Sequence, residues 1–267
     1  MGGAAGQGIR LFVSRLGVDS LMQRRYEKMY SPAVGRDMEL LAYGHYGAPM
    51  IVFPSGGGRY HDIEDNGLIA AVAPLLDAGK LKLYCPDSLD NESWLRDDID
   101  PHWRAVRHSA YQDYILKDLV PAIRADCRNA EQRVGLAGCS LGAYHAVNFA
   151  LKFPHIFHYA LCMSGRYDLE KIAGHSGSQE LYFNNPVAYV PNMHGGTLEH
   201  LRRHAHIVLV CGQGAYEDKC LAETNRLAEL LAQKGISFER DIWGHDVEHH
   251  WYWWRRQFPH HLNRVLG

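Results

Sequence analysis

The chain has 267 residues, of which 46% are hydrophobic and 22% charged, and its formal net charge is −2. This composition is typical of a globular protein, and we expect a single α/β domain over residues 1–267. The near-neutral charge gives no electrostatic footprint for nucleic acid or an anionic membrane surface. No stretch approaches the roughly 18 consecutive apolar residues of a membrane-spanning helix.

The N-terminal residues and the cysteines bear on where the protein works. Residues 1–20 contain glycine and arginine where a secretory signal needs an apolar segment, so export is not indicated. Six cysteines are scattered without a Cys-x-x-Cys pair, and three of them lie in or at the end of apolar runs. That pattern is typical of buried thiols in a reducing compartment, and we expect a cytoplasmic protein.

Apolar runs along the chain predict strands that alternate with helices. Strands are expected at 38–43, 50–54, 81–85, 133–137, 157–163, 207–211 and 238–243, and helices at 67–76, 111–127, 141–152, 221–234 and 249–266. This alternation predicts a mostly parallel sheet with helices on both faces. The first two strands are separated only by residues 44–48, which favours an antiparallel hairpin at the edge of the sheet.

The alternation stops at about residues 165–205, between two predicted strands. We read this stretch as an irregular excursion. It is either a cap-like segment beside the functional site or a plain surface connection, since long loops are functional more often than short ones.

The pentad Gly138-Cys139-Ser140-Leu141-Gly142 has the form Gly-x-Ser-x-Gly. With 26 glycines in the chain such a pentad can arise by chance, but this one lies between a predicted strand and a predicted helix. A serine at such a turn is held with its hydroxyl exposed, and the helix N-terminus favours a developing oxyanion. Ser140 is therefore the candidate nucleophile.

A serine nucleophile needs a base and a carboxylate, and in this chain order both follow the serine. Glu217 and Asp218 come after a predicted strand and just before a helix, and either could serve as the acid or cap the helix. We favour Glu217, with Asp218 as the alternate. A third carboxylate, Asp168, is expected to cap a helix.

Two histidines follow the last predicted strand at the place where the base is expected. His245 comes directly after the strand and His249 lies four residues further on, and their residue types alone do not separate them. On a helix, this i, i+4 spacing could also hold a metal ion, as in His-Glu-x-x-His proteases. Asp246 replaces the glutamate of that motif and Gly244 disfavours a helix, so we expect no metal.

An oxyanion needs two hydrogen-bond donors. The N–H of Leu141, directly after the nucleophile, is the expected first donor. The loop Ser55-Gly56-Gly57-Gly58 follows an early strand and allows close backbone approach, so Gly57 is the expected second donor, with Gly56 as the alternate. No Lys-Ser/Thr completes a phosphate-binding loop there.

With these parts in view, the chain resembles the esterase D-like branch of the α/β-hydrolases, and within it a bacterial group of small esterases. The likeness runs from about residue 25 to the C-terminus and is carried by 52–57, 87–88 with 92–94, 138–143, 182–186 and 243–254. The resemblance implies an α/β-hydrolase fold. It assigns the base to His249, through a Trp-Gly-x-Asp-Val-x-His-x-Trp pattern, and the acid to Glu217. His250 departs from the pattern, which has an acidic residue there.

The leading hypothesis is a serine carboxylesterase that acts on a small-molecule ester through an acyl-enzyme. Two alternatives stay open: an acyltransferase that uses the same triad, and a non-catalytic α/β-hydrolase that serves as a binding module. We expect no cofactor and no nucleic-acid or membrane partner. The sequence leaves a homo-oligomer open and does not identify the natural substrate.

Overall fold

The computed structural model of the protein describes residues 22–267. The prediction that residues 1–20 hold no secretory signal concerns residues outside this range. Its centre is an eight-stranded sheet with the order β1-β2-β4-β3-β5-β6-β7-β8. The strands are β1 (Arg24–Ser31), β2 (Arg36–Tyr43), β3 (Ala48–Phe53), β4 (Leu81–Pro86), β5 (Val134–Cys139), β6 (Phe157–Met163), β7 (His206–Cys211) and β8 (Phe238–Ile242). From β4 to β8 all neighbouring strands are parallel, which confirms the predicted sheet type.

The predicted hairpin between the first two expected strands is wrong. β2 pairs antiparallel with β1 and with β4, and β4 lies between β2 and β3. The short link between β2 and β3 therefore passes over the start of β4. A Cβ atom on Gly47 would lie 2.3 Å from the backbone nitrogen of Leu81, so only glycine fits at this crossing.

The strand β1 was not expected from the sequence. It carries Arg24, Arg25, Glu27 and Lys28 and lies at the sheet's edge, where most of its side chains are exposed or half-buried. An edge strand that faces solvent does not need the apolar run by which buried strands are recognised.

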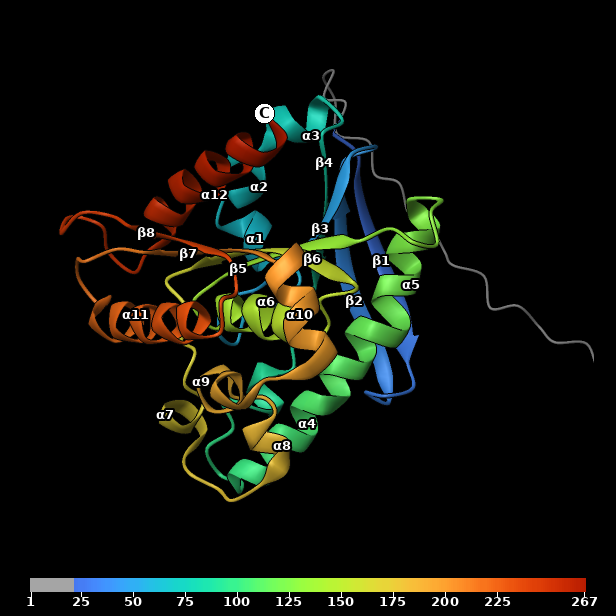
Figure 1. Ribbon diagram of the computed structural model, residues 1–267. Coiled ribbons are helices and arrows are strands. Elements are labelled where there is room, and N and C mark those ends of the chain that lie inside the picture. The colour runs from blue at the N-terminus through green and yellow to red at the C-terminus, as the bar shows by residue number, and fades with distance from the viewer. Residues whose placement is uncertain (1–21) are drawn as a thin grey trace, which may run out of the picture.

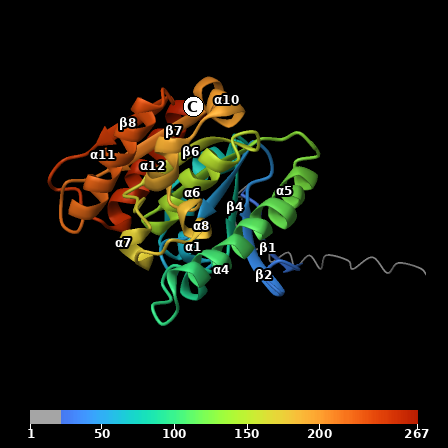
Figure 2. The ribbon, with the colours of Figure 1, turned by 60° about the horizontal axis from the view of Figure 1, so that its bottom comes forward.

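Helices cover both faces of the sheet (Figures 1 and 2). One face packs against α4, α5, α6, α10 and α11, and the other against α1, α2, α3 and α12, and each layer has its own apolar core. The helices are α1 (Asp62–Asp65), α2 (Leu68–Ala71), α3 (Ala73–Asp77), α4 (Pro101–Tyr114), α5 (Val120–Asp126), α6 (Leu141–Lys152), α7 (Glu170–Ala173), α8 (Gln179–Tyr182), α9 (Pro186–Tyr189), α10 (Gly195–His204), α11 (Asp218–Gln233) and α12 (Trp251–Leu266).

The helix predicted at 111–127 is the second part of a longer one. It begins at Pro101, where the Asp100 side chain accepts a hydrogen bond from the N–H of His102, a usual helix start. A π-helical turn, η2 (Ile115–Leu119), joins α4 to α5. Pro121 follows that turn and cannot donate a backbone hydrogen bond, which accounts for the widened turn before it.

The excursion at 165–205 is helical in the structure, with α7, α8, α9 and α10 following one another. The first three have only four residues each, which is too short for a periodic apolar pattern to appear in the sequence. In Figure 1, α7, α8 and α9 lie together below the sheet, near α4.

The arrangement gathers several loops at the carboxyl edge of the parallel strands, where ligands bind in folds of this kind.

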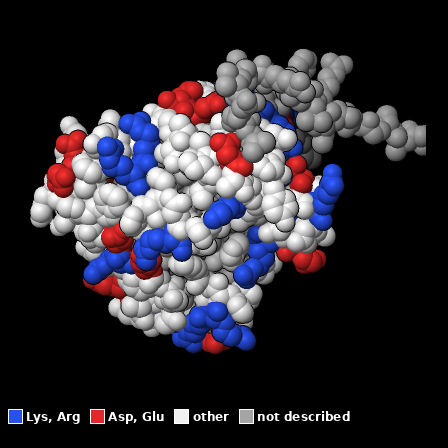
Figure 3. Space-filling model, turned by 90° about the horizontal axis from the view of Figure 1, so that it is seen from above, with Lys and Arg blue, Asp and Glu red and all other residues white. Residues whose placement is uncertain are grey.

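Within residues 22–267, no helix is both long and apolar enough to span a membrane. On the face seen in Figure 3, acidic and basic side chains are interspersed among uncharged atoms.

Candidate active site

Ser140 lies at the turn between β5 and α6, with φ 56° and ψ −119°. A residue other than glycine rarely adopts a positive φ, and such strain collects at functional sites. The turn is tight enough to exclude side chains at its flanks. A Cβ atom would lie 2.3 Å from the backbone of Gly142 if added to Gly138, and 2.5 Å from the carbonyl oxygen of Pro54 if added to Gly142. The two glycines of the pentad therefore make the turn possible.

The imidazole of His249 reaches the serine from the loop between β8 and α12. His249 Nε2 lies 3.1 Å from Ser140 Oγ, within hydrogen-bond range. Its other nitrogen, Nδ1, lies 3.4 Å from Glu217 Oε2. The three side chains come from the loops after three different strands and form a continuous line from hydroxyl to imidazole to carboxylate.

Glu217 is fully buried, and its environment favours the carboxylate. Burial raises the pKa of Glu217, but hydrogen bonds from His249, Ser164 and Cys211 outweigh this, so that the pKa lies below its ordinary value. A buried anion beside Nδ1 holds the imidazole with Nδ1–H toward Glu217 and Nε2 toward Ser140. That is the tautomer which can accept a proton from the serine.

The loops that carry Glu217 and His249 are joined through their backbones. The N–H of Gly214 donates to the carbonyl of Val247 at 2.8 Å, and the N–H of His249 donates to the carbonyl of Ala215 at 3.0 Å. A Cβ atom on Gly212 would lie 2.1 Å from the Val247 oxygen. The contact needs glycine at 212, so the distance from Glu217 to His249 is set by main-chain hydrogen bonds.

Two backbone N–H groups near the start of α6, those of Leu141 and Gly56, are candidate oxyanion donors. As the first residue of α6, Leu141 has an N–H with no intrahelical partner. Gly56 lies against Leu141, because a Cβ atom on Gly56 would be 3.5 Å from Leu141 Cβ. The N–H of Gly57 points elsewhere and donates to Asp90 Oδ2 at 3.4 Å. Within residues 22–267, neither the N–H of Leu141 nor that of Gly56 donates a hydrogen bond to another residue.

A family model described as "Putative esterase" matches residues 31–265 of the chain. The chain belongs to this esterase family. Ester hydrolysis is the chemistry that this membership supports, and the protein is a hydrolase. No curated protein sequence matches the esterase.

Solved structures with the same fold include serine hydrolases and esterases. A ferulic acid esterase matches with a TM-score of 0.72 and 15% identity, over 92% of this chain and 98% of its own. An S-formylglutathione hydrolase from Agrobacterium tumefaciens gives 0.71 and 17%, over 96% and 99%. The fluorophosphonate-binding serine hydrolase FphF of Staphylococcus aureus gives 0.67 and 14%, over 92% and 99%. These likenesses confirm the predicted α/β-hydrolase fold.

The alternate site residues of the esterase, His245 and Asp218, do not take part in the contacts among Ser140, His249 and Glu217. His245 is exposed, and Asp218 is an exposed first residue of α11. The helix that would let His245 and His249 share a metal does not form, since α12 begins only at Trp251. Asp168 does not cap a helix; its carboxylate accepts a hydrogen bond from Asn185.

Two residues behind Glu217 were not found from the sequence. Ser164, at the end of β6, donates from Oγ to Glu217 Oε1. The indole N–H of Trp254 donates to the same Oγ at 3.0 Å, and the Trp254 ring meets the His249 ring edge-on at 4.9 Å. A positive φ of 50° at Ser164 was the only local sign of its role, and it is visible only in the structure.

A second buried histidine–carboxylate pair supports the loop that carries Gly56 and Gly57. His145 Nε2 lies 2.8 Å from Asp90 Oδ1, and both side chains are 1% exposed. The other oxygen of Asp90 accepts the N–H of Gly57. His145 lies on α6, one turn after Leu141, and stacks on His108 with ring centroids 5.3 Å apart. This pair links the glycine loop to the helix that begins at the serine.

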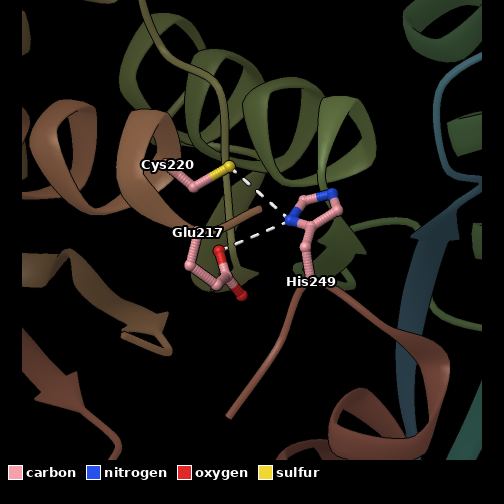
Figure 4. Close-up of side chains that lie close together, drawn as sticks. All are labelled: Glu217, Cys220 and His249. Carbon is pink, nitrogen blue, oxygen red and sulfur yellow. Dashed lines mark hydrogen bonds and ion pairs between the residues drawn. The ribbon is translucent and has the colours of Figure 1, made fainter. Parts of the chain in front are cut away.

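One thiol lies beside the imidazole. Cys220, in the first turn of α11, has its Sγ 3.6 Å from His249 Nδ1. Figure 4 shows Cys220 and Glu217 both directed at this one nitrogen of His249. The thiol is almost fully buried, and burial raises its pKa to about 12.

Proposed function

We propose that the esterase is a serine carboxylesterase, which hydrolyses a small-molecule carboxylic ester through an acyl-enzyme on Ser140. The observation that carries the proposal is the 3.1 Å distance from His249 Nε2 to Ser140 Oγ, with the buried Glu217 behind the ring. A serine hydroxyl is a poor nucleophile unless a base takes its proton, and this distance is within reach of direct transfer.

In the proposed reaction, His249 takes the Ser140 proton while Oγ attacks the ester carbonyl carbon. The imidazolium that forms is stabilised by the Glu217 carboxylate, and it then gives its proton to the departing alcohol. A water molecule, deprotonated by His249, attacks the acyl-enzyme carbonyl carbon. The bond from that carbon to Ser140 Oγ then breaks, Oγ takes the proton back from His249, and the acid is released. In each step a proton moves to or from His249 Nε2, and Glu217 stabilises the charge on the imidazole.

The tetrahedral intermediates need donors for their negative oxygen. We propose the N–H of Leu141 as one donor, with the second from the loop at Gly56 and Gly57. The contact of Gly56 with Leu141 favours Gly56 in this role, because the N–H of Gly57 already has an acceptor in Asp90. The sequence favoured Gly57 as the second donor with Gly56 as the alternate, and this proposal reverses that order.

The proposal is tested with a short-chain p-nitrophenyl ester and the variant Ser140→Ala. The variant should lose turnover while its circular dichroism and melting temperature stay close to those of the unmodified protein. Retained turnover would refute the role of Ser140.

Product analysis with added alcohols separates hydrolysis from acyl transfer. The free acid should remain the main product, and an ester of the added alcohol would identify a transferase. If no ester in a panel of acyl lengths were turned over and no fluorophosphonate labelled Ser140, the protein would be a binding module instead.

A further inference from the structure

Two side chains of types that bind metals, Glu217 and Cys220, approach the same nitrogen of a third, His249, in the proposed active site. Glu217 Oε2 and Cys220 Sγ lie 3.4 Å and 3.6 Å from His249 Nδ1. One ligand atom from each of the three residues lies within 4.8 Å of the other two. Hydrolysis as proposed uses the glutamate and the histidine and gives the thiol no task.

We propose that Glu217, Cys220 and His249 form an inhibitory site for a thiophilic divalent cation such as Zn²⁺. The inference rests on the proposed function, since inhibition has meaning only if His249 is the base. It adds to that function a ligand and a means of regulation: the metal competes with catalysis for the same imidazole.

The spacing of the donor atoms fits tetrahedral zinc. With zinc bonds of about 2.3 Å to sulfur, about 2.05 Å to nitrogen and about 2.1 Å to oxygen, tetrahedral angles place nitrogen about 3.6 Å from sulfur and about 3.4 Å from oxygen. The observed separations from His249 Nδ1 are 3.6 Å and 3.4 Å. Both separations from His249 Nδ1 therefore already match those of tetrahedral zinc, and water would be the fourth ligand.

The chemistry of the donors favours a soft or borderline cation over magnesium or calcium. Thiolate and imidazole select zinc and similar metals, whereas magnesium and calcium bind sets of oxygen ligands. Since burial raises the pKa of the Cys220 thiol, the metal must displace its proton to solvent on binding. The Glu217 carboxylate is already ionised and supplies the second negative charge.

Binding at Nδ1 would abolish catalysis through the tautomer of His249. A neutral imidazole that binds a metal through Nδ1 carries its proton on Nε2, the atom that faces Ser140. Nε2 then donates a hydrogen bond and cannot accept the serine proton. Glu217 also exchanges its hydrogen bond from Nδ1–H for a bond to the metal.

The test titrates chelator-treated enzyme with Zn²⁺ and follows hydrolysis of a p-nitrophenyl ester. Zn²⁺ at micromolar concentration should inhibit the enzyme, and EDTA should restore activity. Cys220→Ala should keep basal activity and need at least about 100-fold more Zn²⁺, because loss of even an outer-shell partner weakens metal binding by about 10–100-fold. Equal inhibition of both proteins would overturn the proposal.

A matched control removes the other cluster of ligands in the described residues, formed by Asp241, His260 and His261. His260→Ala should be inhibited as the unmodified enzyme is, because these residues lie on β8 and α12 and none of them is a ligand of the proposed site. If His260→Ala instead lost the inhibition, the inhibitory metal would bind there and the proposal would fail.

A direct readout separates this inference from the proposed function. Cd²⁺ should give an ultraviolet thiolate-to-metal absorption with the enzyme, with Ser140→Ala and with Cys127→Ser, but not with Cys220→Ala. If the unmodified protein showed this absorption but hydrolysed no ester, the metal site would be supported and the proposed function refuted. If the unmodified protein hydrolysed the ester but showed no such absorption, the proposed function would be supported and the metal site refuted.

Discussion

Two histidine–carboxylate pairs lie near the carboxyl edge of the sheet, and their surroundings differ. His249 is about one-fifth exposed, and its free nitrogen faces Ser140, 3.1 Å away. His145 is buried, and the free oxygen of its partner Asp90 receives the backbone N–H of Gly57. The same two functional groups therefore move protons in the proposed reaction at one place and hold a loop at the other, and on this account access to a nucleophile decides between the two roles.

The largest effect that tests this difference is expected for His249→Ala. Loss of the base should lower kcat/KM for a p-nitrophenyl ester by about 10⁶-fold, as removal of a triad histidine does elsewhere. The melting temperature should change little, because the ring is partly exposed. A variant that kept activity within tenfold would show that His249 is not the base.

Glu217→Gln should lower kcat by about 10⁴-fold, because an amide in place of the carboxylate favours the wrong tautomer of His249. The measurement is kcat at saturating ester, with KM as the internal control. Unchanged kcat would mean that Glu217 does not orient the imidazole.

Asp90→Asn should lower the stability of the protein strongly and its activity less than the two changes above do. Breaking a buried pair by removing one charge costs about 3–5 kcal/mol, so the free energy of unfolding in urea should fall by that amount. Activity of the folded enzyme should drop by no more than about 100-fold, the loss expected from displacing a donor by about 1 Å. A loss as large as that of Glu217→Gln with full stability would place Asp90 in the catalytic machinery.

A third buried residue, His108, which stacks on His145, makes the stability of the protein depend on pH. Burial, and then the charges of His145 and Lys152, hold the pKa of His108 well below its ordinary value. The unfolded chain therefore binds a proton that the folded chain does not, and stability is lost as pH falls below about 6.5. Between pH 6 and 5, this one group contributes a slope that approaches about 1.4 kcal/mol per pH unit. Urea unfolding at several pH values should show a shallower slope for His108→Phe, and equal slopes would contradict this account.

The smallest effect is expected for His245→Ala. The residue is exposed and outside the line of side chains, so activity should stay within about twofold, as for most exposed substitutions. A loss comparable to that of His249→Ala would exchange the roles of the two histidines.

The three side chains that the structure brings together, Ser140, His249 and Glu217, were expected from the sequence, whereas the edge of the sheet was not. Ser140 follows β5 and Glu217 follows β7, and both of these buried parallel strands are readable as apolar runs. His249 follows β8, which is only partly buried, and it was assigned through the family resemblance. β1 is charged and exposed, so it has no such run. The wrong hairpin arose because a short link between two strands does not reveal that a third strand, β4, lies between them.

The supporting residues could not be predicted for a different reason. Asp90 and His145 are 55 positions apart, and neither lies in a local pattern that distinguishes it. Ser164 is an ordinary serine after a strand until Glu217 and Trp254 are folded against it. Long-range pairs of single polar residues leave no periodic signal, so only the folded structure brings them together.

Labelling with a fluorophosphonate tests the central claim most directly. The reagent should attach one group to the protein, on Ser140, and labelling should be absent in Ser140→Ala and much slower in His249→Ala. Peptide mass spectrometry locates the group, and the melting temperatures show that each variant is folded. No labelling, or labelling of another residue at an equal rate in Ser140→Ala, would contradict a nucleophile at Ser140 activated by His249.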